Sequence, residues 1–106
     1  MTITIIAPIK LASGRTEAEL LAASDRFQKE FASQQPGLLR RELVRGKEGD
    51  YLDIIQFRSM KDAEETMARE QDSAACHAFF AVMDMTQASD DPTEAVDIYQ
   101  SLATYT

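Results

Sequence analysis

The stretch "QPGLLRRELVRGKEGDYLDIIQF", residues 35–57, decides the fold. Residues 38–45 and 51–58 are two runs rich in strand-forming side chains, and the glycine-punctuated segment 46–50 separates them. Two such runs around a short glycine-containing segment predict a β-hairpin. The Pro36-Gly37 pair ends the helix that precedes the hairpin.

A strand and a helix are predicted before the hairpin. Residues 2–12 alternate in hydropathy, which is typical of a strand, and place on one face Ile3, Ile5, Ala7, Ile9 and Leu11. Pro8 has no backbone N–H, so we expect the pairing to be interrupted or bulged there. Thr16 and Glu19 have the spacing of a capping box that starts a helix. The apolar stripe of this helix comprises Leu20, Ala23, Phe27 and Phe31.

Two further helices and a last strand are predicted after the hairpin. Ser59 and Ser73 precede apolar-periodic runs and are expected to cap these helices. Residues 86–94 are polar and predict a loop, and residues 95–105 alternate as strand four. The order β-α-β-β-α-β, with its second helical region split, is that of a ferredoxin-like α+β unit. Its four-stranded antiparallel sheet carries helices on one face.

Composition limits the possible partners and compartment. The 106 residues suit one domain, residues 1–106, and the net charge of -7 disfavours nucleic acid and anionic membranes as partners. The single cysteine, Cys76, has no internal disulfide partner, and the start of the chain lacks the features of a signal peptide. We therefore expect a cytoplasmic protein. No apolar run is long enough to span a bilayer.

The predicted sheet is apolar on both faces, although helices cover only one. Ile3 and Ile5 oppose Ile6 in the first strand, and in the third strand Ile55 and Phe57 oppose Leu52 and Ile54. An uncovered apolar face usually marks an interface. A two-fold homodimer that packs sheet against sheet would bury it, so we expect the chain to be its own partner.

The chain resembles the antibiotic biosynthesis monooxygenase family over nearly its whole length. The resemblance rests on "LASGRTEAELLAASDRFQKEFASQQPG", "LLRRELVRGKEGDYLDIIQFRSMKDAEETM" and the following "CHAFF". It implies a dimeric α+β barrel with a pocket between each sheet and its helices. For some members it also implies oxygenation of aromatic polyketides without metal or flavin.

Residue-level comparison separates this chain from the better-understood branches of that family. In the haem-degrading branch, an asparagine on strand one, a tryptophan on the second helix and a histidine about ten positions later carry the function. His77 matches the histidine, but Ala7 and Met67 stand near the other two positions, and the sequence contains no Trp or Asn. Haem cleavage is therefore disfavoured. Polyketide-oxidising members also use asparagine, tryptophan and arginine side chains in the pocket, so the chain departs from their pattern too.

An oxygenase without a cofactor needs a base that ionises its substrate in a dry pocket. His77 is the only imidazole, and we expect burial and the positive end of its helix to keep it neutral. The alternative is a packed, hydrogen-bonded histidine without a catalytic role. Asp53 lies within an apolar strand, and across the hairpin Arg41 or Arg40 is expected to supply a cation near it. Asp53 is either half of a register-fixing ion pair or a second pocket acid that orients the substrate.

The sequence thus predicts a homodimeric, cofactor-independent monooxygenase of a small aromatic compound, phenolic or quinonoid. His77 and Asp53 are the predicted catalytic residues. Substrate-binding roles are predicted for Arg41, Tyr51, Phe57, Met67, Phe80 and Tyr99, although the tyrosines also suit the rim of a dimer interface. No cofactor and no metal are expected. Two alternatives stay open: a non-catalytic dimer that binds a small ligand, and a haem-binding protein that uses His77.

Overall fold

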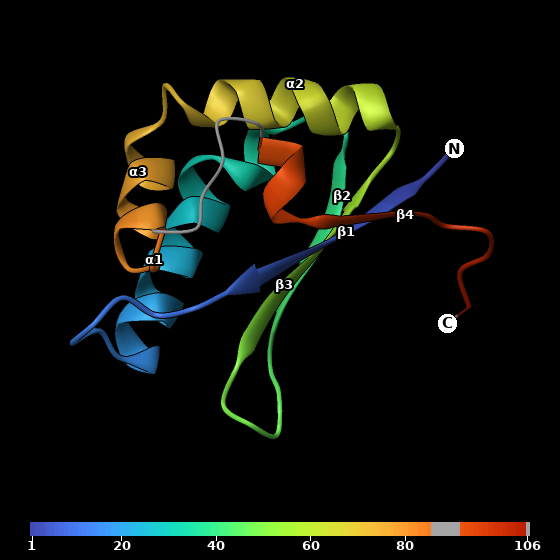
Figure 1. Ribbon diagram of the computed structural model, residues 1–106. Coiled ribbons are helices and arrows are strands. Elements are labelled where there is room, and N and C mark those ends of the chain that lie inside the picture. Colours follow the sequence, from blue (N-terminus) through green and yellow to red (C-terminus); the bar gives the residue numbers. More distant parts are fainter. Residues whose placement is uncertain (86–91, 106) are drawn as a thin grey trace.

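The computed structural model describes residues 1–85 and 92–105 and has the predicted α+β architecture. Four strands form one antiparallel sheet in the order β2-β3-β1-β4. Figure 1 shows α1 and α3 side by side and α2 lying across the end of the sheet. The elements are β1 (Ile3–Ile9), α1 (Glu17–Glu30), η1 (Ala32–Gln34), β2 (Leu38–Arg45), β3 (Tyr51–Phe57), α2 (Met60–Glu70), α3 (Ala74–Ala81), η2 (Pro92–Ala95) and β4 (Asp97–Gln100).

The hairpin predicted within residues 35–57 forms. β2 and β3 pair antiparallel from Leu38 opposite Phe57 to Arg45 opposite Tyr51, with one irregularity near the start of β2. Gly49 adopts a positive φ of 82° in the connecting loop, a conformation that residues with a Cβ adopt at a cost. β1 then pairs with the other edge of β3, which makes β1 and β3 the two central strands.

The sequence predicted that Pro8 interrupts the pairing or produces a bulge, and in the pairing of β1 with β3 it does neither. The register between β1 and β3 is continuous through the pair Pro8 and Leu52. On its other edge, β1 pairs with β4 only from Ile3 to Ile6, so Pro8 lies beyond the end of that ladder. Pro8 therefore lacks its backbone N–H at a position where β1 has no second partner strand among the described residues.

Side-chain caps start all three α-helices where the sequence placed them. The hydroxyl of Thr16 accepts a hydrogen bond from the Glu19 N–H at 3.2 Å, and Ser59 accepts from the Asp62 N–H at 3.2 Å. Ser73 likewise accepts from the Cys76 N–H at 3.3 Å. Each bond satisfies an amide that the first helical turn leaves unpaired, so the helix starts follow from local chemistry.

The helices cover the face of the sheet that carries the buried alternating residues. α1 and α3 enclose one cluster with the end of β1: Ile9, Leu20, Phe27, Phe31, Ala32, Cys76, Phe79 and Val82. α2 closes a second cluster over the central strands: Ile3, Ile5, Phe57 and Ala63. No helix in the described part of the chain is both long and apolar enough to cross a membrane.

The last strand is shorter than predicted. The sequence placed it over residues 95–105, whereas β4 covers only Asp97–Gln100, and Ala95 belongs to the short helix η2. Residues 101–105 form no regular structure, and Leu102 and Tyr105 are 89% and 90% exposed. Alternation alone could not set the length, because these residues meet no second strand within the described chain. The predicted loop lies mostly in residues 86–91, outside the described residues.

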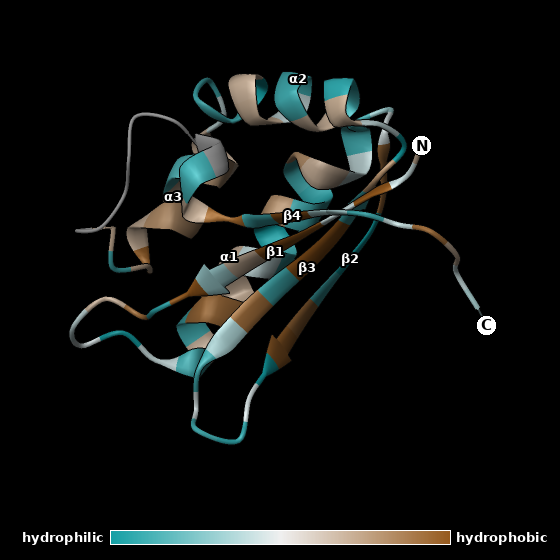
Figure 2. Ribbon diagram, turned by 45° about the vertical axis from the view of Figure 1, so that its right-hand side comes forward, coloured by the Kyte–Doolittle hydropathy of each residue, from teal (hydrophilic) through white to brown (hydrophobic). Residues whose placement is uncertain are grey.

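No helix of residues 1–85 and 92–105 covers the second face of the sheet, as expected (Figure 2). Its centre is formed by directly opposed pairs, Ile6 with Ile54 and Pro8 with Leu52. Arg40 and Glu42 form an ion pair at 3.3 Å on the same face of β2, and Tyr99 of β4 is exposed there. Figure 2 shows hydrophobic stretches along β1 and β3 and the C-terminal segment running out beyond the sheet.

Candidate functional site

A buried ion pair lies between the sheet and the helices. Arg41 of β2 and Asp53 of β3 point to the covered face and lie two residues out of direct register, because Arg41 is opposite Ile55 and Asp53 is opposite Leu43. The Arg41 Nη2 lies 3.0 Å from the Asp53 Oδ2, and the Arg41 Nε lies 3.2 Å from the same oxygen. Only 6% of the Arg41 side chain and 5% of the Asp53 side chain are exposed. The sequence predicted this pairing, and the structure confirms it.

The Arg41 guanidinium is held by further contacts from α1. Its Nη2 donates to the Ser24 hydroxyl at 2.9 Å, and its Nη1 donates to the Gln28 side chain at 3.2 Å. The guanidinium carbon also lies 4.7 Å from the ring centre of Phe27 and 5.5 Å from that of Phe79. These aromatic faces favour a cation electrostatically and exclude water from it. Arg41 is therefore a fixed positive charge in an aromatic environment.

Burial sets the proton affinity of Asp53. Desolvation raises the pKa of this carboxyl above its ordinary value, and the charge and hydrogen bonds of Arg41 act in the opposite direction. Desolvation is the larger of the two effects. The carboxyl is thus harder to ionise than an exposed aspartate, although a cation is beside it.

Glu70 is a second interior carboxyl, which the sequence reasoning missed. It is the last residue of α2 and is only partly exposed. Burial, together with the negative charge of Asp53, raises its pKa from 4.5 to about 7, against a smaller opposing effect of Arg41. The available signal was helical spacing, because Ala63, Thr66 and Glu70 follow one another at intervals of three and four along one face.

Thr66 is an unusual neighbour of Glu70 on that helix face. It is 1% exposed, and its hydroxyl oxygen has no hydrogen-bond partner among the described residues. A buried hydroxyl that makes no hydrogen bond carries a desolvation cost of about 1–3 kcal/mol. Such a group usually has a functional or structural reason, such as a bound water or ligand.

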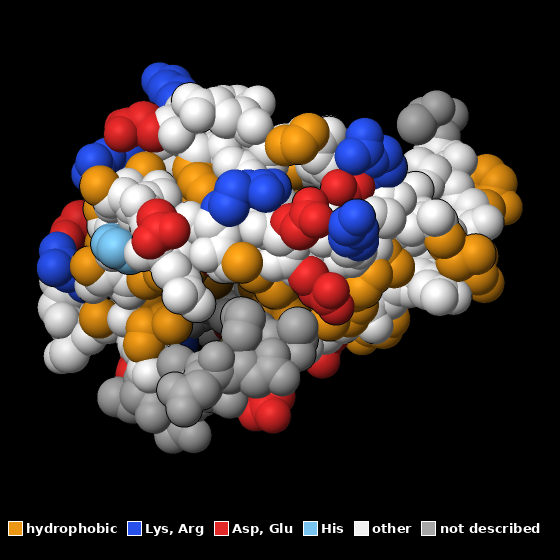
Figure 3. All heavy atoms as spheres, turned by 90° about the horizontal axis from the view of Figure 1, so that it is seen from above, with side chains coloured by type: hydrophobic (Ala, Val, Ile, Leu, Met, Phe, Trp, Pro, Cys, Tyr) orange, Lys and Arg blue, Asp and Glu red, His pale blue; other side chains and the backbone are white. Residues whose placement is uncertain are grey.

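His77 does not lie in this interior cluster. The sequence predicted that it is buried, but the structure places it on the exposed side of α3, so that prediction is wrong. A ring nitrogen, Nε2, lies 2.7 Å from the backbone carbonyl of Gln71. Figure 3 shows the single histidine at the outer surface, close to charged side chains. The residues of α3 that do face inward are Ala75, Cys76 and Phe79.

The remaining predicted site residues are divided among four places. Phe57 is buried in the cluster under α2, where Met67 packs against it, and Phe80 packs against the other cluster. Tyr51 is half-buried near the hairpin loop and donates to the Glu17 carboxylate at 3.1 Å. Tyr99 lies on the uncovered face of the sheet. The structure therefore groups Arg41 and Asp53 but does not bring all the predicted residues together.

Cys76 is a core residue, as the sequence predicted. It is fully buried, and burial raises the pKa of its thiol to about 11. A thiol with this pKa is not ionised near neutral pH and is a poor nucleophile. The described residues also include no group of three or more His, Cys, Asp or Glu side chains that could hold a metal ion.

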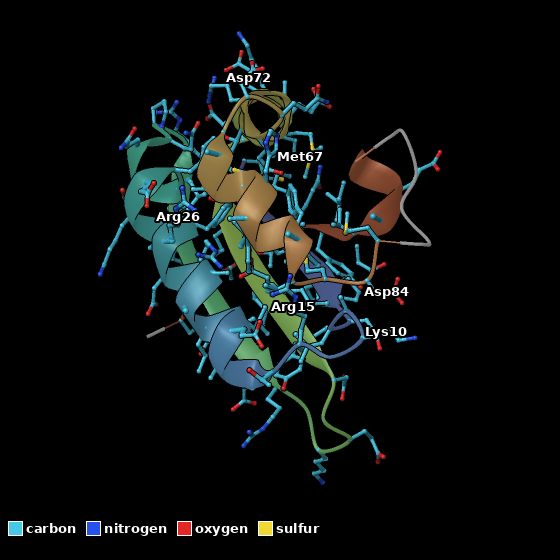
Figure 4. The ribbon with its side chains drawn as sticks, turned by 90° about the vertical axis from the view of Figure 1, so that its left-hand side faces the viewer. Lys10, Arg15, Arg26, Met67, Asp72 and Asp84 are labelled. Carbon is cyan, nitrogen blue, oxygen red and sulfur yellow. The ribbon has the colours of Figure 1, made fainter. Side chains whose placement is uncertain are left out.

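Two hollows open away from the buried ion pair. A hollow of about 600 Å³ lies at the end of β1, and its lining includes Pro8, Leu52 and Met85. Lys10 and Asp84, also in its lining, form an ion pair at 3.8 Å, and Figure 4 shows these two side chains close together. A smaller hollow of about 250 Å³ lies under the start of α1. Tyr51 lines both hollows.

The element order, the one-sided helical layer and the buried polar cluster define a ferredoxin-like α+β protein of the antibiotic biosynthesis monooxygenase type of fold. Comparison with solved structures confirms the predicted resemblance at the level of the fold. No protein-family model matches the chain, and no curated protein does.

Two of the similar structures illustrate the match. SnoaB, a cofactor-independent oxygenase from Streptomyces nogalater, is 17% identical, with 97% of this chain and 95% of that chain covered and a TM-score of 0.71. A "putative antibiotic biosynthesis monooxygenase" from Caulobacter crescentus is 23% identical, with 98% and 91% covered and a TM-score of 0.65. At these identities the likeness is one of fold.

Proposed function

We propose that the protein is a cofactor-independent monooxygenase of a small phenolic or quinonoid compound. The observation that carries this proposal is the Arg41 and Asp53 pair, buried beneath Phe27 and Phe79 in a fold also found in a cofactor-independent oxygenase. A fixed cation beside aromatic rings favours an aromatic anion over the neutral phenol, because its charge is not screened by water.

The reaction class follows from electron balance. The ionised substrate supplies all the electrons that reduce dioxygen, so one oxygen atom enters the product and the other leaves as water. Arg41 would stabilise the substrate oxyanion, and Asp53 would hold the guanidinium in place through its two hydrogen-bonded oxygens. The aromatic rings limit water access to the developing radical and anionic species.

Oxygen uptake tests this proposal. We expect the purified protein to consume one O2 per molecule of a monophenol from a panel of small phenols, and to form the para-quinone, with one oxygen atom from O2 in the quinone and the other in water. The double variant Arg41→Met/Asp53→Leu removes both charges together. It should lower kcat/KM at least about 100-fold, because the cation that stabilises the substrate oxyanion is lost. Arg40→Met on the uncovered face is the matched control. Wild-type activity in the double variant, or no uptake with any phenol, would contradict the proposal.

We also propose that two copies pack through their uncovered sheet faces, centred on Ile6, Leu52 and Ile54. Replacing Ile54 by arginine would place two buried charges in a two-fold interface. We expect this change to raise the dimer dissociation constant more than about 100-fold, which sedimentation velocity would measure. Leu21→Arg, on the exposed side of α1, should leave the dimer intact. A wild-type monomer at micromolar concentration would refute the pairing.

The alternatives predicted from the sequence remain testable beside this proposal. Haem binding through His77 fits the site poorly, because Nε2 already contacts a backbone carbonyl and the ring lies outside the interior cluster. A Soret band on addition of haem would support haem binding. Non-catalytic binding of a small ligand would give thermal stabilisation by phenols without oxygen uptake.

The free, buried Cys76 supports the proposed cytoplasmic location.

A further inference from the structure

Two polar side chains on the inward face of α2 lack partners within the described chain. The Thr66 hydroxyl is buried and makes no hydrogen bond there. Glu70 follows it by four residues, so both side chains lie on one helix face, and the Glu70 carboxylate makes none of the hydrogen bonds or ion pairs found among the described residues. The neighbouring interior polar groups are in contrast paired: Arg41 and Asp53 are hydrogen-bonded to each other, and Arg41 also donates to Ser24 of α1. The interior polar side chains that lack hydrogen-bond partners in the described part of the chain are therefore both on α2.

We propose that Glu70 is the proton acceptor for an acidic hydroxyl group on a bound aromatic ligand, and that Thr66 supplies a second hydrogen bond to that ligand. The inference rests on the proposed oxygenase function, because it names the base that this reaction requires. It assigns to Glu70 the role that the sequence gave to His77.

The proton transfer leaves the charge of the cluster unchanged. The O–H bond of the phenol breaks, its electron pair stays on the phenol oxygen, and the proton forms a new O–H bond on the Glu70 carboxylate. One negative charge moves from Glu70 to the ligand, while Arg41 and Asp53 keep their charges. Arg41 exerts an electrostatic effect on Glu70, and the same cation would stabilise a phenolate bound against that carboxyl.

Accessibility favours Glu70 over Asp53 as the base. Asp53 is 3% exposed and is hydrogen-bonded to Arg41, so a ligand reaches its oxygens only by displacing the guanidinium. Glu70 keeps part of its surface exposed at the end of α2, next to the turn that leads to α3. Figure 4 looks along α2 and shows Asp72 of that turn directed away from the sheet, so Asp72 belongs to the outer surface.

The electrostatic surroundings suit a base that works near neutral pH. The charged and titratable groups that act on Glu70 are Arg41 from β2 and Asp53 from β3, while Cys76 from α3 is itself affected by Glu70. Burial and the negative charge of Asp53 raise the pKa of Glu70 to about 7 against the opposing charge of Arg41, and this value is close to the one at which a general base is most effective. The Cys76 thiol, with a pKa of about 11, does not compete for the proton near neutral pH.

The first experiment measures the carboxyl group directly, without oxygen. Protein labelled with 13C at the glutamate side-chain carboxyl is titrated by NMR, and the Glu70 signal is assigned by its loss in Glu70→Gln. We expect this signal to titrate near pH 7 and to shift when 4-nitrophenol is added anaerobically. Glu70→Gln should weaken 4-nitrophenol binding at least about tenfold, because a charge-assisted hydrogen bond is lost. Glu65→Gln, on the exposed side of α2, is the matched control.

The second experiment measures oxygen uptake by the same variants across pH. For the wild type we expect kcat/KM to rise through pH 7, and for Glu70→Gln we expect a loss of this step and a rate about 10²- to 10⁴-fold lower. Thr66→Val should raise KM with a smaller change in kcat. Glu65→Gln should keep the step.

The two experiments separate failure of the inference from failure of the proposed function. If the Glu70 signal shifts with 4-nitrophenol but no phenol supports oxygen uptake, the ligand site is supported and the oxygenase function is refuted. If oxygen uptake is found and Glu70→Gln retains it with the pH step, the function stands and the role of Glu70 is refuted. A Glu70 signal that titrates at the usual glutamate value, or that ignores 4-nitrophenol, overturns the inference. Loss of the pH step in His77→Ala does so too.

Discussion

Replacing Arg41 by alanine is expected to lower the free energy of unfolding by about 3–5 kcal/mol, because it leaves the Asp53 carboxyl buried without its cation. Both side chains are almost completely enclosed, and Arg41 also packs against Phe27 and Phe79. A domain of this size has a total stability of about 5–15 kcal/mol, so the variant should be close to unfolding at 37 °C. Urea unfolding followed by circular dichroism measures the change.

Two comparisons show whether the uncompensated charge causes that loss. Arg40→Ala removes the neighbouring arginine, whose side chain is exposed on the other face of the sheet, and should change stability by less than about 0.5 kcal/mol. Arg41→Met/Asp53→Leu removes both charges and should recover most of the lost stability, because apolar side chains of similar volume replace the pair. A double variant as unstable as Arg41→Ala would show that packing around Arg41, and not charge pairing, dominates.

The elements that depend on local chemistry were predictable from the sequence. The caps at Thr16, Ser59 and Ser73 are short-range hydrogen bonds, and the hairpin follows from two alternating runs around a glycine-containing loop. The pairing of Arg41 with Asp53 was also within reach, because strand alternation puts both on the covered face once the hairpin register is approximately known.

The features that depend on tertiary packing were not predictable from local patterns. α3 is apolar around most of its circumference, so its sequence does not show which side faces the sheet, and His77 was assigned to the wrong side. The high pKa of Glu70 arises from burial and from Asp53, which is distant in sequence. The length of β4 depends on how far β1 offers it a partner, which single-strand alternation does not encode.

Glu70→Gln is expected to stabilise the protein above pH 7 by about 3 kcal/mol, while having little effect near pH 4.5. The pKa of Glu70 is raised in the folded state from 4.5 to about 7, so between these values the folded protein holds a proton that the unfolded chain has released. Stability therefore falls as pH rises through this window. Above pH 7 both states are ionised, and the folded state keeps the full cost of burying the charge.

The difference between wild type and variant isolates this one group. Asp53 and Cys76 titrate in both proteins, so their contributions largely cancel in the difference, whereas the amide that replaces the Glu70 carboxyl does not titrate and keeps nearly the same shape. Urea unfolding from pH 4.5 to 8.5 should give a difference that grows through the window and then levels off. Glu65→Gln should give a flat difference, because that carboxyl is exposed. A flat difference for Glu70→Gln would mean that Glu70 is solvated in the folded protein. An interior carboxyl lowers the stability of the folded protein, and its replacement by an amide would restore that stability. This is expected of a side chain that is retained for its chemistry and not for its contribution to the fold.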